Sequence, residues 1–136
     1  VTLKPRDGAP FRLYNIHTDH VGKYARVLEV NQLLARIAED DKKLKTPVFV
    51  TGDFNDTPDS LCIKTMLEYD GGRFTDLCSD SGQTFHAFGS YINEAGKIDY
   101  IFAENGTKCI QTEVIRDRRG SLYLSDHYPI MAEVEI

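Results

Sequence analysis

The sequence lacks tryptophan, has only two methionines and three cysteines, and shows no excess of basic residues over its 136 positions. No apolar run approaches the roughly 18 to 20 residues that a membrane-spanning helix needs, so we predict no transmembrane segment. Cys62, Cys78 and Cys109 show no C-x-x-C spacing. This argues against a disulfide framework or a zinc knuckle and favours reduced, mostly buried thiols. The formal net charge of -5 argues against a broad basic surface for nucleic-acid backbones.

An initiator methionine is also missing, and the chain opens on a strand-like pattern that soon reaches a turn signal. We therefore expect that an upstream segment is missing and that any signal peptide would lie there. Localisation stays open on this evidence, with the cytoplasm as the default. The one basic cluster, "RDRRG" at 116–120, is expected to be a solvated hairpin turn, and a phosphate contact is the alternative.

The pattern of apolar residues predicts alternating strands and helices. Strands are expected at 11–17 and around "PVFV" at 47–50, and a helix that Asp19 caps is expected at 23–40 between them. A second helix follows at about 59–69, and the later strands are "KIDYIF", "KCIQTEVI" and "IMAEVEI". We predict a single domain over 1–136 of the α/β (α+β) class, with one mixed β-sheet and its helices on one face.

Polar residues collect at the ends of these strands, where functional sites are usually built. They are His17, Asp53, Asn55, Asp99, Asp126 and His127. Taken alone, "GDFN" is more typical of an Asx turn, and "SDHYPI" is more typical of a solvated turn before the last strand. Asp99 shares a strand face with Ile101, so we expect a largely buried carboxylate that needs a partner such as an imidazolium.

The ordered set "NIHTDH", "GDFN", "TFHAFG", "KIDYIF" and "SDHYP" resembles the endonuclease/exonuclease/phosphatase superfamily, the deoxyribonuclease I-like metal-dependent phosphoesterases. The resemblance implies half of a four-layer αββα sandwich, because only the C-terminal half of such a domain is matched. The N-terminal half, with the glutamate that is the principal metal ligand, would be missing. His86 in "TFHAFG" fits either a pocket-lining or a structural histidine.

The resemblance also implies a role for each residue of the site. His127 would be the catalytic imidazole at the scissile phosphate, and Asp99 would accept its other ring proton and hold its orientation. Asn55 would donate hydrogen bonds to the phosphoryl oxygens, and His17 would stabilise the same oxygens or help the leaving group.

The expected cofactor is Mg²⁺ or Mn²⁺, since hard oxygen ligands favour these ions. Asp126 and Asp53 are the predicted metal ligands, and Asp53 would also position or deprotonate the attacking water. A zinc site at "HTDH" is a weaker alternative, because Thr18 stands where the corresponding metallo-β-lactamase pattern has a second histidine.

The predicted function is metal-dependent hydrolysis of phosphoester bonds, as a phosphodiesterase or phosphatase and possibly a nuclease, by in-line attack of water on a Mg²⁺-bound phosphate. The alternative is an inactive fragment or interaction module that retains the scaffold. The acidic balance favours a phosphorylated small molecule or lipid headgroup over duplex DNA. A missing N-terminal half or a second chain is expected to cover the open sheet face, and this fragment alone is expected to bind metal weakly and turn over poorly.

Overall fold

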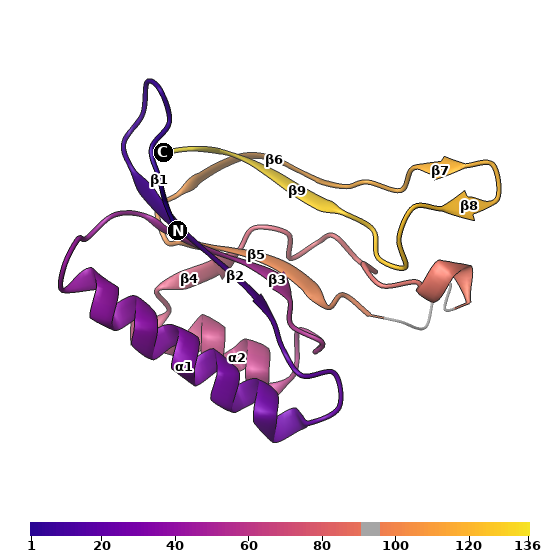
Figure 1. Ribbon diagram of the computed structural model, residues 1–136, viewed down its shortest axis with the longest axis horizontal. Coiled ribbons are helices and arrows are strands. Elements are labelled where there is room, and N and C mark those ends of the chain that lie inside the picture. The colour runs from indigo at the N-terminus through magenta and orange to yellow at the C-terminus, as the bar shows by residue number, and fades with distance from the viewer. Residues whose placement is uncertain (91–95) are drawn as a thin grey trace.

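The computed structural model describes residues 1–90 and 96–136, which form a five-stranded sheet with two helices against one of its faces (Figure 1). The strand order is β1-β2-β3-β5-β4. The strands are Thr2–Leu3 (β1), Phe11–His17 (β2), Val48–Asp53 (β3), Phe74–Asp76 (β4) and Asp99–Glu104 (β5). The helices are Lys23–Asp41 (α1) and Leu61–Glu68 (α2). Because β2 and β3 are parallel and the other pairs are antiparallel, the sheet is mixed, as predicted.

The core lies between the helices and the sheet. From α1 it takes Val30, Leu34 and Ile37, whose spacing of four and three places them on one side of the helix. Phe54 follows β3 and is completely buried, with edge-to-face contacts to the rings of Tyr100 and Phe102 at 5.4 and 5.3 Å. This buried ring anchors the end of β3, where Asp53 lies, and the loop after it, which carries Asn55.

The prediction that Asp19 caps the first helix is wrong. Gly22 occupies the N-cap position of α1 and makes no side-chain cap bond. Asp19 Oδ1 instead accepts hydrogen bonds from the backbone N–H groups of Val21 and Gly22, at 2.7 and 2.5 Å, in an Asx turn that leads into the helix. In α2, by contrast, Ser60 is a true cap whose hydroxyl accepts from the backbone N–H of Ile63.

Two further strand pairs lie outside this sheet. One pairs Lys108–Val114 (β6) with Ile130–Glu135 (β9), and the other pairs Arg118–Arg119 (β7) with Leu122–Tyr123 (β8). The β6–β9 ribbon lies across the sheet from the helices (Figure 1). The expectation that all the later strands join one sheet is therefore wrong. Both edges of β5 already pair, with β3 and with β4, so β6 has no edge there to join.

No helix in the described ranges is both long and apolar enough to cross a membrane. The thiols follow the expectation for the most part, since Cys62 and Cys78 are buried and Cys109 is exposed on β6. Burial raises the pKa of each buried thiol to about 11.

Gly52, next to Asp53 on β3, is required by close packing of two strands. Its φ is +144°, and a Cβ atom there would lie 1.8 Å from the carbonyl oxygen of Ile16 on β2. Gly52→Ala is therefore expected to lower the free energy of unfolding by about 3 kcal/mol or more, measured by urea denaturation. Gly106→Ala is the matched control: φ there is +94° with no atom within 4 Å, so about 1 kcal/mol of backbone strain is expected. Equal losses in the two variants would contradict the steric argument.

Candidate active site

Three of the predicted site residues lie in a row across the sheet. His17 at the end of β2 is directly opposite Asp53 at the end of β3, and Asp53 is directly opposite Asp99 at the start of β5. Side chains alternate along a strand, so these three point away from the face that Val50 and Tyr100 bury against the helices. Neighbouring strands are only about 4.8 Å apart, and the register alone therefore brings the three functional groups together.

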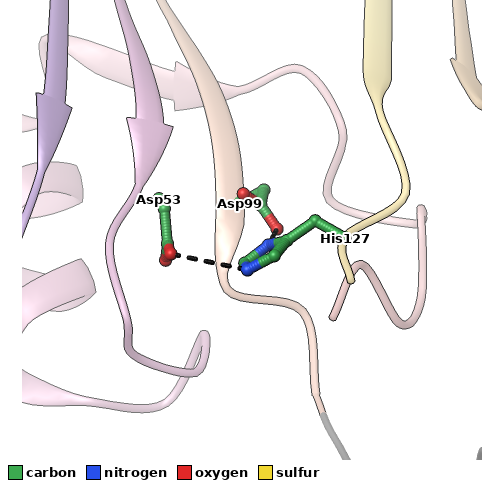
Figure 2. A group of neighbouring side chains, drawn as sticks. All are labelled: Asp53, Asp99 and His127. Atoms are coloured by element: carbon green, nitrogen blue, oxygen red, sulfur yellow. Dashed lines mark hydrogen bonds and ion pairs between the residues drawn. The ribbon is translucent and has the colours of Figure 1, made fainter. Parts of the chain in front are cut away.

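His127 completes the group from the turn before β9 (Figure 2). Its Nδ1 lies 2.9 Å from Asp99 Oδ2, and its Nε2 lies 3.8 Å from Asp53 Oδ2. The expected imidazole partner of Asp99 is thus His127. His17 lies at the margin, with Nε2 3.5 Å from Asp53 Oδ2 and a side chain that is 72% exposed.

The electrostatics of the site centre on Asp53. Burial raises the pKa of this carboxyl above its ordinary value, and the negative charge of Asp99 raises it further. The backbone N–H of Asn55, at 2.7 Å from Asp53 Oδ1, and the two imidazoles of His127 and His17 act in the opposite direction. A carboxyl that resists ionisation in this way is suited to proton transfer.

Asn55 lies two residues after Asp53, beyond the buried Phe54. Its backbone is in the left-handed region, with φ at 48°. Its Nδ2 donates a hydrogen bond to the backbone carbonyl oxygen of Thr18 at 2.8 Å, which ties the β3 loop to the end of β2. One N–H of the amide is used in this contact, and a second remains for another acceptor.

Asp126 lies in a bend of the chain, and its contacts differ from those of its neighbour His127. Its carboxylate contacts the Ser125 hydroxyl at 3.3 Å, and its backbone carbonyl accepts hydrogen bonds from the N–H groups of His86 and Ala87. Within the part of the chain that the structure describes, Asp126 is not a member of the group formed by Asp53, Asp99 and His127.

The donor set fits a hard divalent cation. One potential ligand atom each from Asp53, Asp99 and His127 lies within 4.8 Å of the others. Because Asp99 is already bonded to His127, Asp53 Oδ2 is the carboxylate oxygen of this group that is best placed for an ion. Mg²⁺ commonly keeps several waters and takes only one or two protein carboxylates, so a small donor set of this kind suits it.

Thr84 is a supporting residue that we did not single out from the sequence. Its side chain is fully buried, and its hydroxyl accepts hydrogen bonds from the backbone N–H groups of Ile98 and Asp99, at 3.0 and 3.1 Å. Its carbonyl oxygen accepts from the N–H of Tyr128 at 2.7 Å. One residue therefore holds the chain on both sides of the Asp99–His127 bond. Its only signal in the sequence was its place in "TFHAFG".

His86, from the same segment, is a structural histidine that also borders the site. It is 1% exposed, and its ring packs against those of Tyr123 and Tyr128, at centroid distances of 4.3 and 4.1 Å. Its Nδ1 accepts a hydrogen bond from the backbone N–H of Gly89. Together with His127 it lines a small cavity of about 50 Å³.

The chain has the deoxyribonuclease I-like fold class. It shows a mixed sheet with helices on one face, and carboxylates and imidazoles gather at the strand ends. A model of the Endonuclease/Exonuclease/phosphatase family matches residues 2–127, and the chain belongs to this family. None of the curated protein sequences matches it.

Solved structures similar to the chain include an endonuclease/exonuclease/phosphatase from Bacteroides vulgatus, at 30% identity and a TM-score of 0.80 over 96% of this chain and 51% of that one. The mannosyl-6-phosphatase of Bacteroides thetaiotaomicron has 24% identity and a TM-score of 0.83, over 96% of this chain and 53% of that one. The human Nocturnin catalytic domain with bound sulfate has 16% identity and a TM-score of 0.67, over 97% and 51%. The chain thus spans about half the length of each.

The raised pKa of Asp53 predicts how stability depends on pH. At pH values between the pKa of Asp53 in the unfolded chain and its higher pKa in the folded chain, the folded chain binds more protons than the unfolded one. The stabilisation from the protonated carboxyl is therefore complete below about pH 3.9 and is lost as the pH rises through the folded pKa. Asp53→Asn keeps the acceptor for Asn55 and removes the charge. Without metal, its Tm at pH 7 should exceed that of the wild type, and the difference should shrink towards pH 3.5.

Calorimetry in EDTA across this pH range would measure the effect. The exposed Asp7 is the control, and Asp7→Asn should leave Tm unchanged. A Tm for Asp53→Asn below that of the wild type at pH 7 would contradict the electrostatic account.

Thr84→Val should destabilise the chain by about 2 kcal/mol or more, because it leaves the buried N–H groups of Ile98 and Asp99 without an acceptor. Thr84→Ser keeps the hydroxyl and should cost about 1 kcal/mol. Urea denaturation gives both values, and the amide resonance of Asp99 in a ¹H–¹⁵N spectrum should move far more in the valine variant. Equal effects of the two substitutions would show that the hydroxyl is unimportant.

Proposed function

We propose that this chain supplies the C-terminal half of a metal-dependent phosphoesterase domain. The observation that carries the proposal is the convergence of His127, Asp99 and Asp53, with Asp99 bonded to one ring nitrogen of His127 and the other ring nitrogen directed towards Asp53 (Figure 2). Membership of the Endonuclease/Exonuclease/phosphatase family supports the same reaction class.

His127 is the residue we assign to the scissile phosphate. The bond from Nδ1 to Asp99 fixes the ring orientation, so that Nε2 can donate a hydrogen bond to a phosphoryl oxygen or transfer a proton. Asp53, whose pKa is raised, is assigned to the attacking water, since it can orient the water and accept its proton.

Asn55 and His17 are assigned to the phosphoryl and leaving-group oxygens. The second N–H of the Asn55 amide is an uncharged donor two residues after Asp53, and the exposed imidazole of His17 lies beside the Asp53 carboxylate. Hydrogen-bond donors of this kind compensate for the charge that builds up on phosphoryl oxygens in the transition state.

Asp53 and Asp126 are the proposed ligands of Mg²⁺ or Mn²⁺. Asp53 presents Oδ2 to the site, and among the described residues the carboxylate of Asp126 bonds only to the Ser125 hydroxyl, which leaves oxygen lone pairs for a cation. When bound, the ion would neutralise charge on the phosphate and polarise its oxygens.

For the substrate we propose a small phosphorylated molecule. The sugar-phosphatase name of one structural neighbour and the acidic balance of the chain support this choice over duplex DNA. The neighbours are about twice as long as this chain. We therefore propose that a further segment or a second chain covers the sheet face opposite the helices and completes the metal site.

The test is magnesium-dependent hydrolysis of p-nitrophenyl phosphate and bis-p-nitrophenyl phosphate, by this chain alone and by a complete domain in which it is joined to the N-terminal half of a family member. The complete domain should be active and the chain alone far less so. His127→Ala in the complete domain should lower kcat by at least about 100-fold, because the proton-transfer and charge-stabilising group is lost.

His20→Ala is the matched control, since His20 is exposed and lies outside the group. Its activity should equal that of the parent. A folded complete domain that hydrolyses neither ester in Mg²⁺ or Mn²⁺ would refute catalysis and favour the interaction module.

A further inference from the structure

A cluster of three tilted rings, with a guanidinium group over each of its two tyrosines, lies beside the candidate active site. The His86 ring packs against the rings of Tyr128 and Tyr123 at centroid distances of 4.1 and 4.3 Å, and the two tyrosine rings lie 6.4 Å apart. The guanidinium carbon of Arg116 lies 4.6 Å from the centroid of Tyr128, and that of Arg118 lies 5.4 Å from the centroid of Tyr123. Both arginines belong to "RDRRG", so this segment is more than the solvated turn expected from its composition.

These arginines differ from those of the sheet-and-helix layer in having no acidic partner. Four arginines of that layer, Arg12, Arg26, Arg36 and Arg73, each form an ion pair with an aspartate or glutamate. Among the described residues, no carboxylate lies within the ion-pair distance of 4.0 Å of Arg116, Arg118 or Arg119.

Protein contacts leave most of their N–H groups available. Arg116 Nη2 donates to the backbone oxygen of Gln83 at 3.3 Å, and Arg118 Nη1 donates to the Tyr123 hydroxyl at 3.4 Å. Each guanidinium has five N–H groups, so its place over a tyrosine ring orients the cation and leaves donors for an anion. Residues 116–119 carry one aspartate, Asp117, and three arginines that have no acidic partner among the described residues. Three positive charges and one negative charge give this segment a local formal charge of +2 in a chain with a net charge of -5, which favours anions.

The ring cluster is connected to the site through a shared cavity. Tyr123, Tyr128 and His86 line the same small cavity as His127, together with Asp117. The carbonyl oxygen of Asp126 also accepts a hydrogen bond from the N–H of His86, which holds the ring cluster to the residue before His127. A substrate whose phosphate lies at His127 would therefore extend towards the arginines if it continued along this wall.

We propose that Arg116 and Arg118 form a subsite for a second phosphate group of the substrate. The proposal rests on the proposed function for the position of the first phosphate and goes beyond it in specifying a bisphosphorylated small molecule. Guanidinium groups bind phosphate through paired charge-assisted hydrogen bonds, and stacking on tyrosine reduces the conformational entropy lost on binding. Arg119, the third unpaired cation, adds to the local positive potential.

The experiment compares binding of glucose 1,6-bisphosphate and glucose 6-phosphate to this chain by calorimetry at low ionic strength in EDTA. The bisphosphate should bind at least about tenfold more tightly. The double variant Arg116→Gln/Arg118→Gln should lose this preference, and Arg116→Lys/Arg118→Lys should keep part of it. Arg6→Gln removes the same charge from an exposed loop and should keep the full preference.

No turnover is needed for this measurement, so it is independent of the proposed reaction. A preference for the bisphosphate in a chain that proves catalytically inactive would support the subsite and refute the proposed function. An equal affinity for the two sugars, or a preference that survives the double glutamine variant, would overturn the subsite. Arginine-dependent binding to phosphatidylserine vesicles without any preference between the sugars would also overturn it, in favour of a lipid surface.

Discussion

The fold must hold two carboxylates directly opposite each other on neighbouring strands, and the rest of the site depends on how it does so. Like charges in cross-strand pairs destabilise a sheet, and Asp53 and Asp99 form such a pair. The ring of His127 bonds to one carboxylate and faces the other, which offsets the repulsion. The turn before β9 is thus held to the sheet by the same group that we assign to catalysis, so the geometry of the site and the attachment of this turn cannot vary independently.

Uncharged contacts from Thr84 and Phe85 support this arrangement. The hydroxyl and carbonyl of Thr84 bind the backbone beside Asp99 and after His127, and the ring of Phe85 packs on His127 at a centroid distance of 4.9 Å. Buried backbone hydrogen bonds of this kind keep the charged groups at fixed separations when no ligand is present. Rigid support for a charged group is what allows its stabilisation to act in a transition state without reorganisation. The raised pKa of Asp53 is the cost of that arrangement.

Much of the fold could be predicted because apolar periodicity depends on local sequence. The strand that ends at His17 and the helix from Lys23 follow directly from it. The register that aligns His17, Asp53 and Asp99 could not be predicted, since it depends on pairing between strands far apart in the chain. The separate β6–β9 ribbon was missed for the same reason. The role of Thr84 was missed because a buried hydroxyl bonded to backbone leaves no pattern in the sequence.

The contrast among the three cysteines has a practical consequence. The two buried thiols are almost wholly protonated near neutral pH, since their pKa values are raised to about 11, and they are also shielded from reagents. Cys109 is exposed on β6, in the ribbon that lies on the other side of the sheet from the helices (Figure 1). A maleimide dye or spin label would therefore attach at one defined point of the native chain. Spectroscopy from that point could follow the arrival of a covering segment without any engineered cysteine.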